Sequence, residues 1–195
     1  DLETVIVGIG GGGLIAGVAA AVKARAAAEG RTVRVIGVQA ENSAAYPASL
    51  AAGEPLTVET TPTIADGIAV ARPGELTFEV ISELVDEVVT VSDDDIARAL
   101  LNLLERAKQV VEPAGAVGVA AILAGKVRAS GPTAVILSGG NIDPLLLQRV
   151  VAHGLAASGR YMTLQIPLPD RPGQLARVSE LLSIAGANVI EVLHP

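Results

Sequence analysis

Four consecutive glycines, at residues 10–13, stand between a β-branched run at residues 4–7 and an alanine-rich segment that begins near Leu14. Glycine has no Cβ, so a backbone built from it can turn sharply and bring its N–H groups close to a ligand. The first amides of a helix have no partner inside the helix, and they lie at the positive end of the helix dipole. A strand, a glycine loop and a helix in this order therefore predict an anion-binding site, and phosphate is the usual ligand of such a site.

A second glycine turn follows the apolar segment TAVIL at residues 133–137, which is typical of a buried strand. Ser138, Gly139, Gly140 and Asn141 form this turn, and a helix is expected to start after it, near Pro144. On sequence alone, Ser138 could face a ligand or simply cap the next turn. Glu112, which opens the segment EPAGA, has the same ambiguity, because a glutamate also suits the positive end of a helix dipole.

The elements that position these residues alternate between strand and helix signals, which predicts an α/β fold. We expect strands at 4–8, 33–39, 87–91 and 133–137, and helices at 14–28, from 47, at 75–84, 93–109 and 112–125. Residues 60–70 lack periodicity and are rich in turn formers, as functional loops often are. Ser92 and Asp95 have the spacing of a capping box, so the acidic run there is expected to start a helix and not to bind metal.

The pattern changes after residue 157. Residues 161–168 alternate like a strand, residues 174–185 form an amphipathic helix, and residues 187–193 read as another strand. This βαβ piece is too small to bury its own sheet face. We therefore expect a main domain at 1–157, a linker at 158–160 and an incomplete second domain at 161–195. Because no initiator Met precedes the first strand, we expect the chain to be a fragment.

Composition excludes several classes of protein. The net charge is −7 and only three residues are aromatic, which argues against a nucleic-acid binder. No apolar stretch approaches the roughly 20 residues of a membrane helix. The chain has no cysteine, which excludes disulfides, thiolate metal sites and a cysteine nucleophile and fits a cytoplasmic protein.

The order of the motifs is more specific than any one of them. VGIGGGGLIAG, VIGVQAEN, ADGIAV, VEPAGAVGVAAIL and VILSGGN follow one another along residues 7–141. This series resembles the C-terminal half of the fold-type II pyridoxal-phosphate enzymes, most closely the threonine dehydratase (threonine ammonia-lyase) group, with serine racemase as near kin. The tail, with LPDRPGQLARV and GANVIEV, resembles the start of an ACT domain. The resemblance implies a three-layer open parallel sheet, followed by a truncated, ferredoxin-like βαβ piece.

The resemblance also implies a cofactor, pyridoxal phosphate, and roles for particular residues. Its phosphate would be bound by the backbone N–H groups of Gly10, Gly11, Gly12, Gly13 and Leu14. Ser138 would meet the pyridine nitrogen, Gly139 would shape the turn, and Glu112 would lie near the ring. Asp66 and Gly67 would border the substrate. A neutral hydroxyl at the nitrogen limits carbanion build-up, which suits β-elimination better than transamination.

The implied reaction converts L-threonine to 2-oxobutanoate and ammonia, or L-serine to pyruvate and ammonia. The Schiff-base lysine of such enzymes has no counterpart here, because Lys23, Lys108 and Lys126 do not stand in the family's lysine motif. We therefore assign no catalytic residue and expect the chain alone to be inactive. In the tail, Gly173 and Asn188 would contact an effector amino acid, isoleucine or valine. Relatives imply a homo-oligomer.

A metal site is not expected. Relatives with a divalent cation use an acid after the second strand, a backbone carbonyl four residues on, and an acid two residues further. Glu41 and Ala45 match the first two positions, but the third is Pro47. The loss of one carboxylate weakens a site for a hard cation.

Two alternatives stay open on the sequence. Gly8, Gly10 and Gly13 fit the GxGxxG pattern of a Rossmann-type NAD-binding domain, and Glu41 stands where a ribose-binding acid is expected. That interpretation leaves the second glycine turn unexplained. The chain could also be a non-catalytic effector-binding module that acts through its tail.

Overall fold

The computed structural model describes residues 1–160 and 162–193. The chain divides into two compact units, with the division at Met162. Each unit is described by itself. Among the described residues, no helix combines the length and the apolar character needed to cross a membrane.

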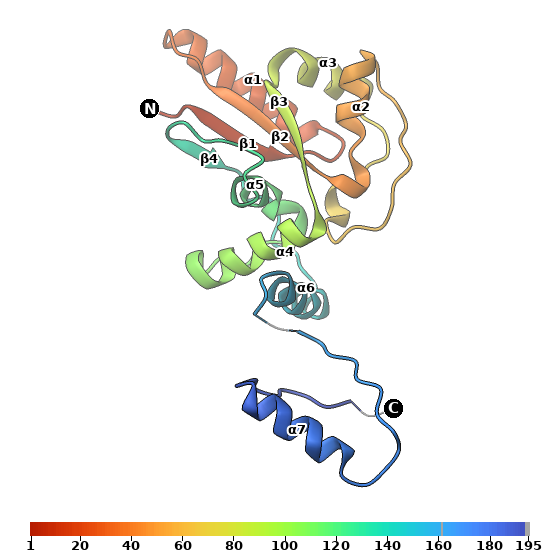
Figure 1. The fold of residues 1–195 in the computed structure, drawn as a ribbon. Coiled ribbons are helices and arrows are strands. Elements are labelled where there is room, and N and C mark those ends of the chain that lie inside the picture. Colours follow the sequence, from red (N-terminus) through yellow and green to blue (C-terminus); the bar gives the residue numbers. More distant parts are fainter. Residues whose placement is uncertain (161, 194–195) are drawn as a thin grey trace. The chain divides into compact units, whose positions relative to one another are not determined.

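The first unit is built on a four-stranded sheet in the order β3-β2-β1-β4, and every neighbouring pair is parallel (Figure 1). The strands are β1 (Thr4–Gly8), β2 (Arg34–Ala40), β3 (Glu87–Val91) and β4 (Thr133–Val135). All four predicted strands are therefore confirmed. β4 is shorter than predicted and only half-buried, because it is an edge strand that pairs with β1 alone.

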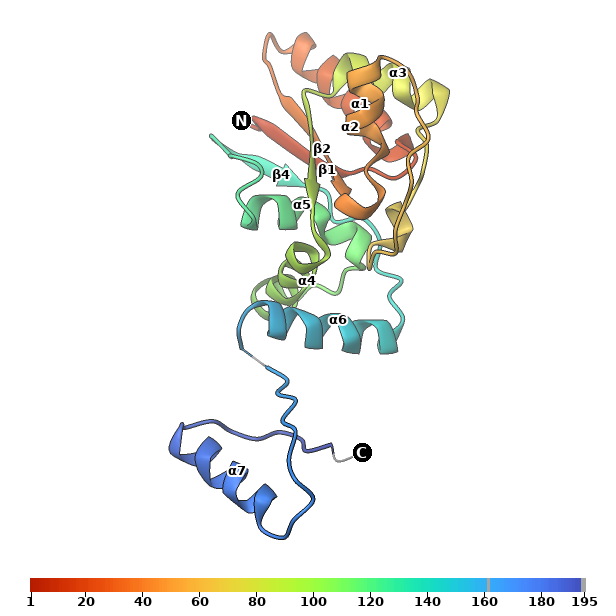
Figure 2. The same cartoon turned by 45° about the vertical axis from the view of Figure 1, so that its right-hand side comes forward.

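Helices cover both faces of this sheet (Figures 1 and 2). Successive side chains of a strand point to opposite faces, so Val5 and Val7 enter one core and Ile6 enters the other. The core of Val5 and Val7 contains side chains of α1 (Gly13–Ala28), α2 (Ala45–Ala52) and α3 (Glu75–Leu84). The core of Ile6 contains side chains of α4 (Asp93–Asn102), α5 (Pro113–Leu123) and α6 (Pro144–Ala157). This is the predicted three-layer α/β architecture.

The helix after β3 starts as predicted. The Ser92 hydroxyl accepts from the Asp95 N–H, and the Asp95 carboxylate accepts from the Ser92 N–H, both at 3.2 Å. The prediction of one regular helix to residue 109 is wrong. The α-helix ends at Asn102, a wider π-type turn covers Leu103–Ala107, and Lys108 leaves it in a left-handed conformation at φ 57°.

The second unit contains the predicted helix, α7 (Gln174–Ile184), which begins after Gly173 at φ 88°. The two predicted strands beside it are wrong, because residues 162–168 and 187–193 form no strand in the structure. A strand exists only where a neighbour takes up its backbone hydrogen bonds, and within the described part of this unit neither segment has such a neighbour. The apolar side chains of α7, such as Leu181 and Ile184, stay exposed.

Candidate functional site

The two glycine turns follow neighbouring strands. β1 and β4 are parallel and in direct register, with Ile6 opposite Val135, so their carboxyl ends meet at the same edge of the sheet. The loop at residues 10–13 follows β1, and the turn at residues 138–141 follows β4. In open α/β sheets, ligands bind at the carboxyl edge of the strands.

A hollow of about 240 Å³ lies at this edge. Its lining contains every residue predicted to contact the cofactor: Gly10, Gly11, Gly12, Gly13, Leu14, Glu112, Ser138 and Gly139. Gly8, Gly67, Ile68 and Ala114 complete the lining. The two turns thus border the same hollow, although residues 10 and 138 are 128 positions apart in the sequence.

The amino end of α1, a helix of 16 residues, forms part of the lining of this hollow. Within the described residues, the amides of residues 10–14 donate to no backbone carbonyl, and the first turn of α1 contains no acidic side chain. Unpaired amides and the positive end of the dipole therefore border the hollow, and α1 itself supplies no acidic side chain that would offset them. This is the arrangement that binds phosphate.

The glycines of the loop have different reasons for lacking a side chain. Gly12 has a φ of 94°, and a Cβ there would lie 2.1 Å from the Tyr46 hydroxyl. Gly11 and Gly13 would meet no atom within 4 Å, so they border open space. The loop is packed on one side and leaves room on the other, which fits a phosphate group.

The packed side holds contacts that sequence reasoning missed. The hydroxyls of Tyr46 and Thr77 reach the carbonyl oxygen of Gly11, at 3.2 and 2.7 Å. Gln39 is fully buried, and it accepts from the Tyr46 N–H at 2.9 Å and donates to the Ile9 carbonyl at 3.4 Å. The pKa of the Tyr46 phenol is raised above its ordinary value, because the effect of burial outweighs the opposite effect of the hydrogen bond with Thr77. No local motif marks these residues; the only signal was that Tyr46 is one of three aromatic residues.

The opposite wall is formed where α5 begins. Glu112 occupies the N-cap position of this helix without a capping hydrogen bond from its side chain, and its N–H donates to the carbonyl of Gly139 at 3.2 Å. Gly139 has a φ of 83°, and a Cβ there would lie 2.1 Å from the Glu112 carboxylate. The lack of a side chain at Gly139 thus lets Glu112 lie against the turn that carries Ser138.

The loop of residues 60–70 contributes one of its two predicted residues. Gly67 lines the hollow, and a Cβ there would lie 3.5 Å from the Glu112 carboxylate. Asp66 is exposed and does not belong to the lining. Both residues belong to the short 3₁₀ turn Asp66–Ile68.

None of the three lysines lines the hollow. Lys23 pairs with Asp86 at 2.6 Å, and Lys126 lies 4.0 Å from Glu41. Glu41 is exposed after β2 and is absent from the lining, so it does not stand where a ribose-binding acid would contact a ligand held by the glycine loop. Within the described residues, no three His, Cys, Asp or Glu side chains gather in a way that could hold a metal ion.

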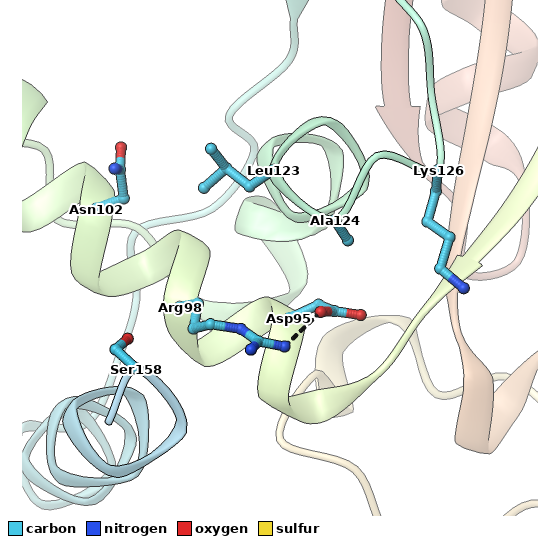
Figure 3. A pocket seen from close by; sticks show the side chains of 7 residues that line it. All are labelled: Asp95, Arg98, Asn102, Leu123, Ala124, Lys126 and Ser158. Carbon is cyan, nitrogen blue, oxygen red and sulfur yellow. Dashed lines mark hydrogen bonds and ion pairs between the residues drawn. The ribbon is translucent and has the colours of Figure 1, made fainter. Parts of the chain in front are cut away.

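A larger hollow, of about 510 Å³, lies elsewhere in the first unit (Figure 3). Its lining consists of Asp95, Arg98, Asn102, Leu123, Ala124, Lys126 and Ser158. Asp95 is already engaged, since it pairs with Arg98 at 2.7 Å and caps α4. This hollow has neither glycine turn in its lining, so the chemistry favours the smaller one.

Comparisons with known proteins show to which family the chain belongs. Residues 1–139 match the family model described as "Pyridoxal-phosphate dependent enzyme". The chain is 48% identical over 195 residues to L-threonine ammonia-lyase of Thermotoga maritima, covering all of this chain and 47% of that protein. It is 50% identical over 146 residues to L-threonine dehydratase catabolic TdcB of Escherichia coli, covering 73% of this chain and 43% of that protein. The chain thus spans about half the length of the curated relatives that it matches.

Solved structures give the same result. A threonine deaminase from T.th. superposes with a TM-score of 0.68 at 42% identity, over 73% of this chain and 51% of that one. Maize serine racemase superposes with a TM-score of 0.69 at 38% identity, over 76% of this chain and 47% of that one. The family match also decides between the two interpretations of the glycine loop, in favour of pyridoxal phosphate over NAD. The chain belongs to the family of pyridoxal-phosphate dependent enzymes.

Proposed function

We propose that the chain is part of a threonine ammonia-lyase, which converts L-threonine to 2-oxobutanoate and ammonia and L-serine to pyruvate and ammonia. The relatives named L-threonine ammonia-lyase or dehydratase, at 46–50% identity, support this substrate class. The observation that carries the proposal is the composition of the hollow, since the glycine loop at residues 10–13 and the turn that begins at Ser138 both line it.

The described residues would hold pyridoxal phosphate at its two ends. The amides of residues 10–14 would donate to the phosphate oxygens, and the α1 dipole would favour their charge. The hydroxyl of Ser138 would lie at the pyridine nitrogen, and Glu112 would lie beside the ring. When bound, pyridoxal phosphate supplies an electron sink for the bond that breaks at the amino-acid α-carbon.

Ser138 sets the strength of that electron sink. A carboxylate at this position would keep a proton on the pyridine nitrogen, whereas a neutral hydroxyl does not. The weaker sink suits loss of a β-hydroxyl better than transamination. The donors of the glycine loop are fixed before the reaction begins, so negative charge next to them needs no reorganisation of the protein.

The described residues do not provide a reacting amine at the hollow, because Lys23, Lys108 and Lys126 all lie outside its lining. We propose that this chain binds and orients the cofactor and that it does not turn over threonine by itself. Asp66 and Gly67 are proposed to border the substrate. Gly67 lines the hollow, and Asp66 is the exposed residue next to it in the sequence.

The test is a binding comparison on the 195-residue chain. Pyridoxal phosphate, pyridoxal and NAD are titrated separately by calorimetry, and threonine turnover is followed by the appearance of a 2-oxo acid. We expect pyridoxal phosphate to bind most tightly, pyridoxal to bind more weakly because it lacks the phosphate, and no turnover. Tighter binding of NAD than of pyridoxal phosphate would overturn the proposal.

For the tail we propose an incomplete ACT-like regulatory domain at residues 161–195, joined to the domain at 1–157 by a linker at 158–160. Residues 161, 194 and 195 lie outside the described residues. The helix that begins after Gly173 supports this proposal, and Gly173 and Asn188 are its proposed effector contacts. Calorimetry with isoleucine and with valine tests it, and heat from neither would remove it. A homo-oligomer, which the family resemblance implies, and a cytoplasmic location, which the lack of cysteine fits, stay proposals.

A further inference from the structure

Two hydroxyl groups from different helices meet at one carbonyl of the glycine loop. Thr77 of α3 donates to the Gly11 oxygen at 2.7 Å, and Tyr46 of α2 reaches the same oxygen at 3.2 Å. The two hydroxyl oxygens are 3.1 Å apart. Neither residue lines the hollow. They therefore hold the loop from behind and leave its other side to the ligand.

This contact fixes the direction of an amide. A peptide unit is planar and trans, so the Gly11 carbonyl and the Gly12 N–H point in opposite directions. With the carbonyl held against α2 and α3, the Gly12 N–H points away from these helices. Gly12 itself lines the hollow. Its missing side chain is what lets the two hydroxyls come close, since a Cβ there would lie 2.1 Å from the Tyr46 oxygen.

Tyr46 is itself firmly placed. Its side chain is fully buried, and its N–H donates to the side chain of Gln39, which in turn donates to the Ile9 carbonyl. Gln39 is also fully buried. The glycine loop is therefore tied to α2 at residue 9 through Gln39 and at residue 11 through the phenol. A buried network with every member paired is rigid.

We propose that Tyr46 and Thr77 are positioning residues, which lock the peptide between Gly11 and Gly12 so that its amide is presented to a phosphate in the hollow. The inference rests on the proposed function, because it takes the phosphate of pyridoxal phosphate as the ligand. Loss of either hydroxyl removes one of the two contacts to the Gly11 carbonyl and loosens the peptide, so part of the binding free energy is then spent on ordering it.

The experiment compares two variants with two matched controls on the 195-residue chain. Tyr46→Phe and Thr77→Val each remove one hydroxyl of the pair. Thr77→Ser keeps the hydroxyl, and Ser49→Ala removes another buried hydroxyl of α2, which donates to the Ala45 carbonyl at 2.7 Å and does not contact the loop. Dissociation constants for inorganic phosphate and for pyridoxal phosphate are measured by calorimetry. The ¹³C shift of the Gly11 carbonyl is measured without ligand by NMR.

We expect Tyr46→Phe and Thr77→Val each to weaken binding of both probes by about two- to tenfold, the worth of one net hydrogen bond. The Gly11 carbonyl signal should move in both variants. Thr77→Ser and Ser49→Ala should keep the affinity and the carbonyl shift of the parent chain. Rescue by serine marks an effect of the hydroxyl and not of general packing.

The proposal is overturned if both variants bind as the parent does, or if Ser49→Ala weakens binding as much as they do. If the parent chain binds neither probe, the proposed function fails at this site. The carbonyl shift then still decides separately whether the two hydroxyls hold the Gly11 peptide, because it is read without ligand. An unmoved Gly11 signal in both variants would refute that hold.

Discussion

Replacement of Gly12 by alanine is the most informative single change to the glycine loop. Gly12 has a φ of 94°, which alanine rarely adopts. The added Cβ would lie 2.1 Å from the Tyr46 hydroxyl, 2.8 Å from Ile81 Cδ1 and 2.9 Å from Thr77 Cβ. Tyr46 and Ile81 are fully buried, so neither can move out of the way without disturbing the core.

The cost has two parts. The left-handed conformation costs an alanine about 1–2 kcal/mol. Forcing an extra carbon into a packed region costs about 1–3 kcal/mol more. We therefore expect Gly12→Ala to lower the free energy of unfolding by about 2–5 kcal/mol, a large share of the ~5–15 kcal/mol of an ordinary domain.

Urea unfolding followed by circular dichroism measures this change. Gly17→Ala is the matched control, because Gly17 lies inside α1, the helix that Gly12 precedes as the N-cap residue, is exposed, and would meet no atom within 4 Å. There the substitution should raise the free energy of unfolding by about 0.5–1 kcal/mol, since alanine is the better helix former. Equal urea midpoints for Gly12→Ala and the parent chain would refute the claim that this position is packed against Tyr46.

Three further predictions concern other parts of the first unit. Ser92→Ala removes the cap of α4 and should lower the free energy of unfolding by about 0.5–2 kcal/mol in urea titrations; an unchanged midpoint would mean that the capping box contributes nothing. Burial acts to raise the pKa of both Asp86 and Asp95, but hydrogen bonds from Lys23 to the first and from Ser92 to the second lower it, and each net shift is downward. The two carboxylates thus stabilise the fold above the ordinary pKa of 3.8, and this contribution is lost as the pH falls through their folded pKa values. The urea midpoint of the parent should therefore drop between about pH 6 and about pH 3. It should drop less in the Asp86→Asn, Asp95→Asn double variant, which lacks both carboxylates. Burial raises the pKa of Tyr46 above 10.0, so its contribution is present below that pH and lost above it, and Tyr46→Phe should flatten the alkaline fall of the urea midpoint; an equally steep fall in the variant would contradict this.

The elements of the first unit follow from local sequence patterns. The β-branched run before the glycines, the proline at the start of α6 and the capping box at Ser92 each act within a few residues, so their structural effect can be predicted without knowledge of the fold. The strands predicted in the tail fail for the complementary reason. Alternating apolar residues at 162–168 and 187–193 favour a strand, but a strand also needs a partner, and sequence alternation does not supply one.

The candidate site shows the same division. Glycine turns act through their own backbone, so residues 10–13 and 139 were predictable from type and spacing. The two hydroxyls that contact the Gly11 carbonyl come from residues 35 and 66 positions away along the chain. Only the parallel pairing of β1 with β2, and the packing of helices against these strands, brings the two hydroxyls to Gly11. Asp66 and Gly67 show a further limit, since a motif locates a turn but not which of two adjacent residues lines the hollow.

The central claim is that one pyridoxal phosphate molecule contacts both glycine turns at the same time. Amide NMR of the ¹⁵N-labelled chain during a titration with pyridoxal phosphate tests it directly. We predict that the amides of residues 10–14 and those of Ser138 and Gly139 shift together, with one common dissociation constant. Saturable shifts at only one of the two turns, or two different dissociation constants, would contradict a single cofactor seated between them.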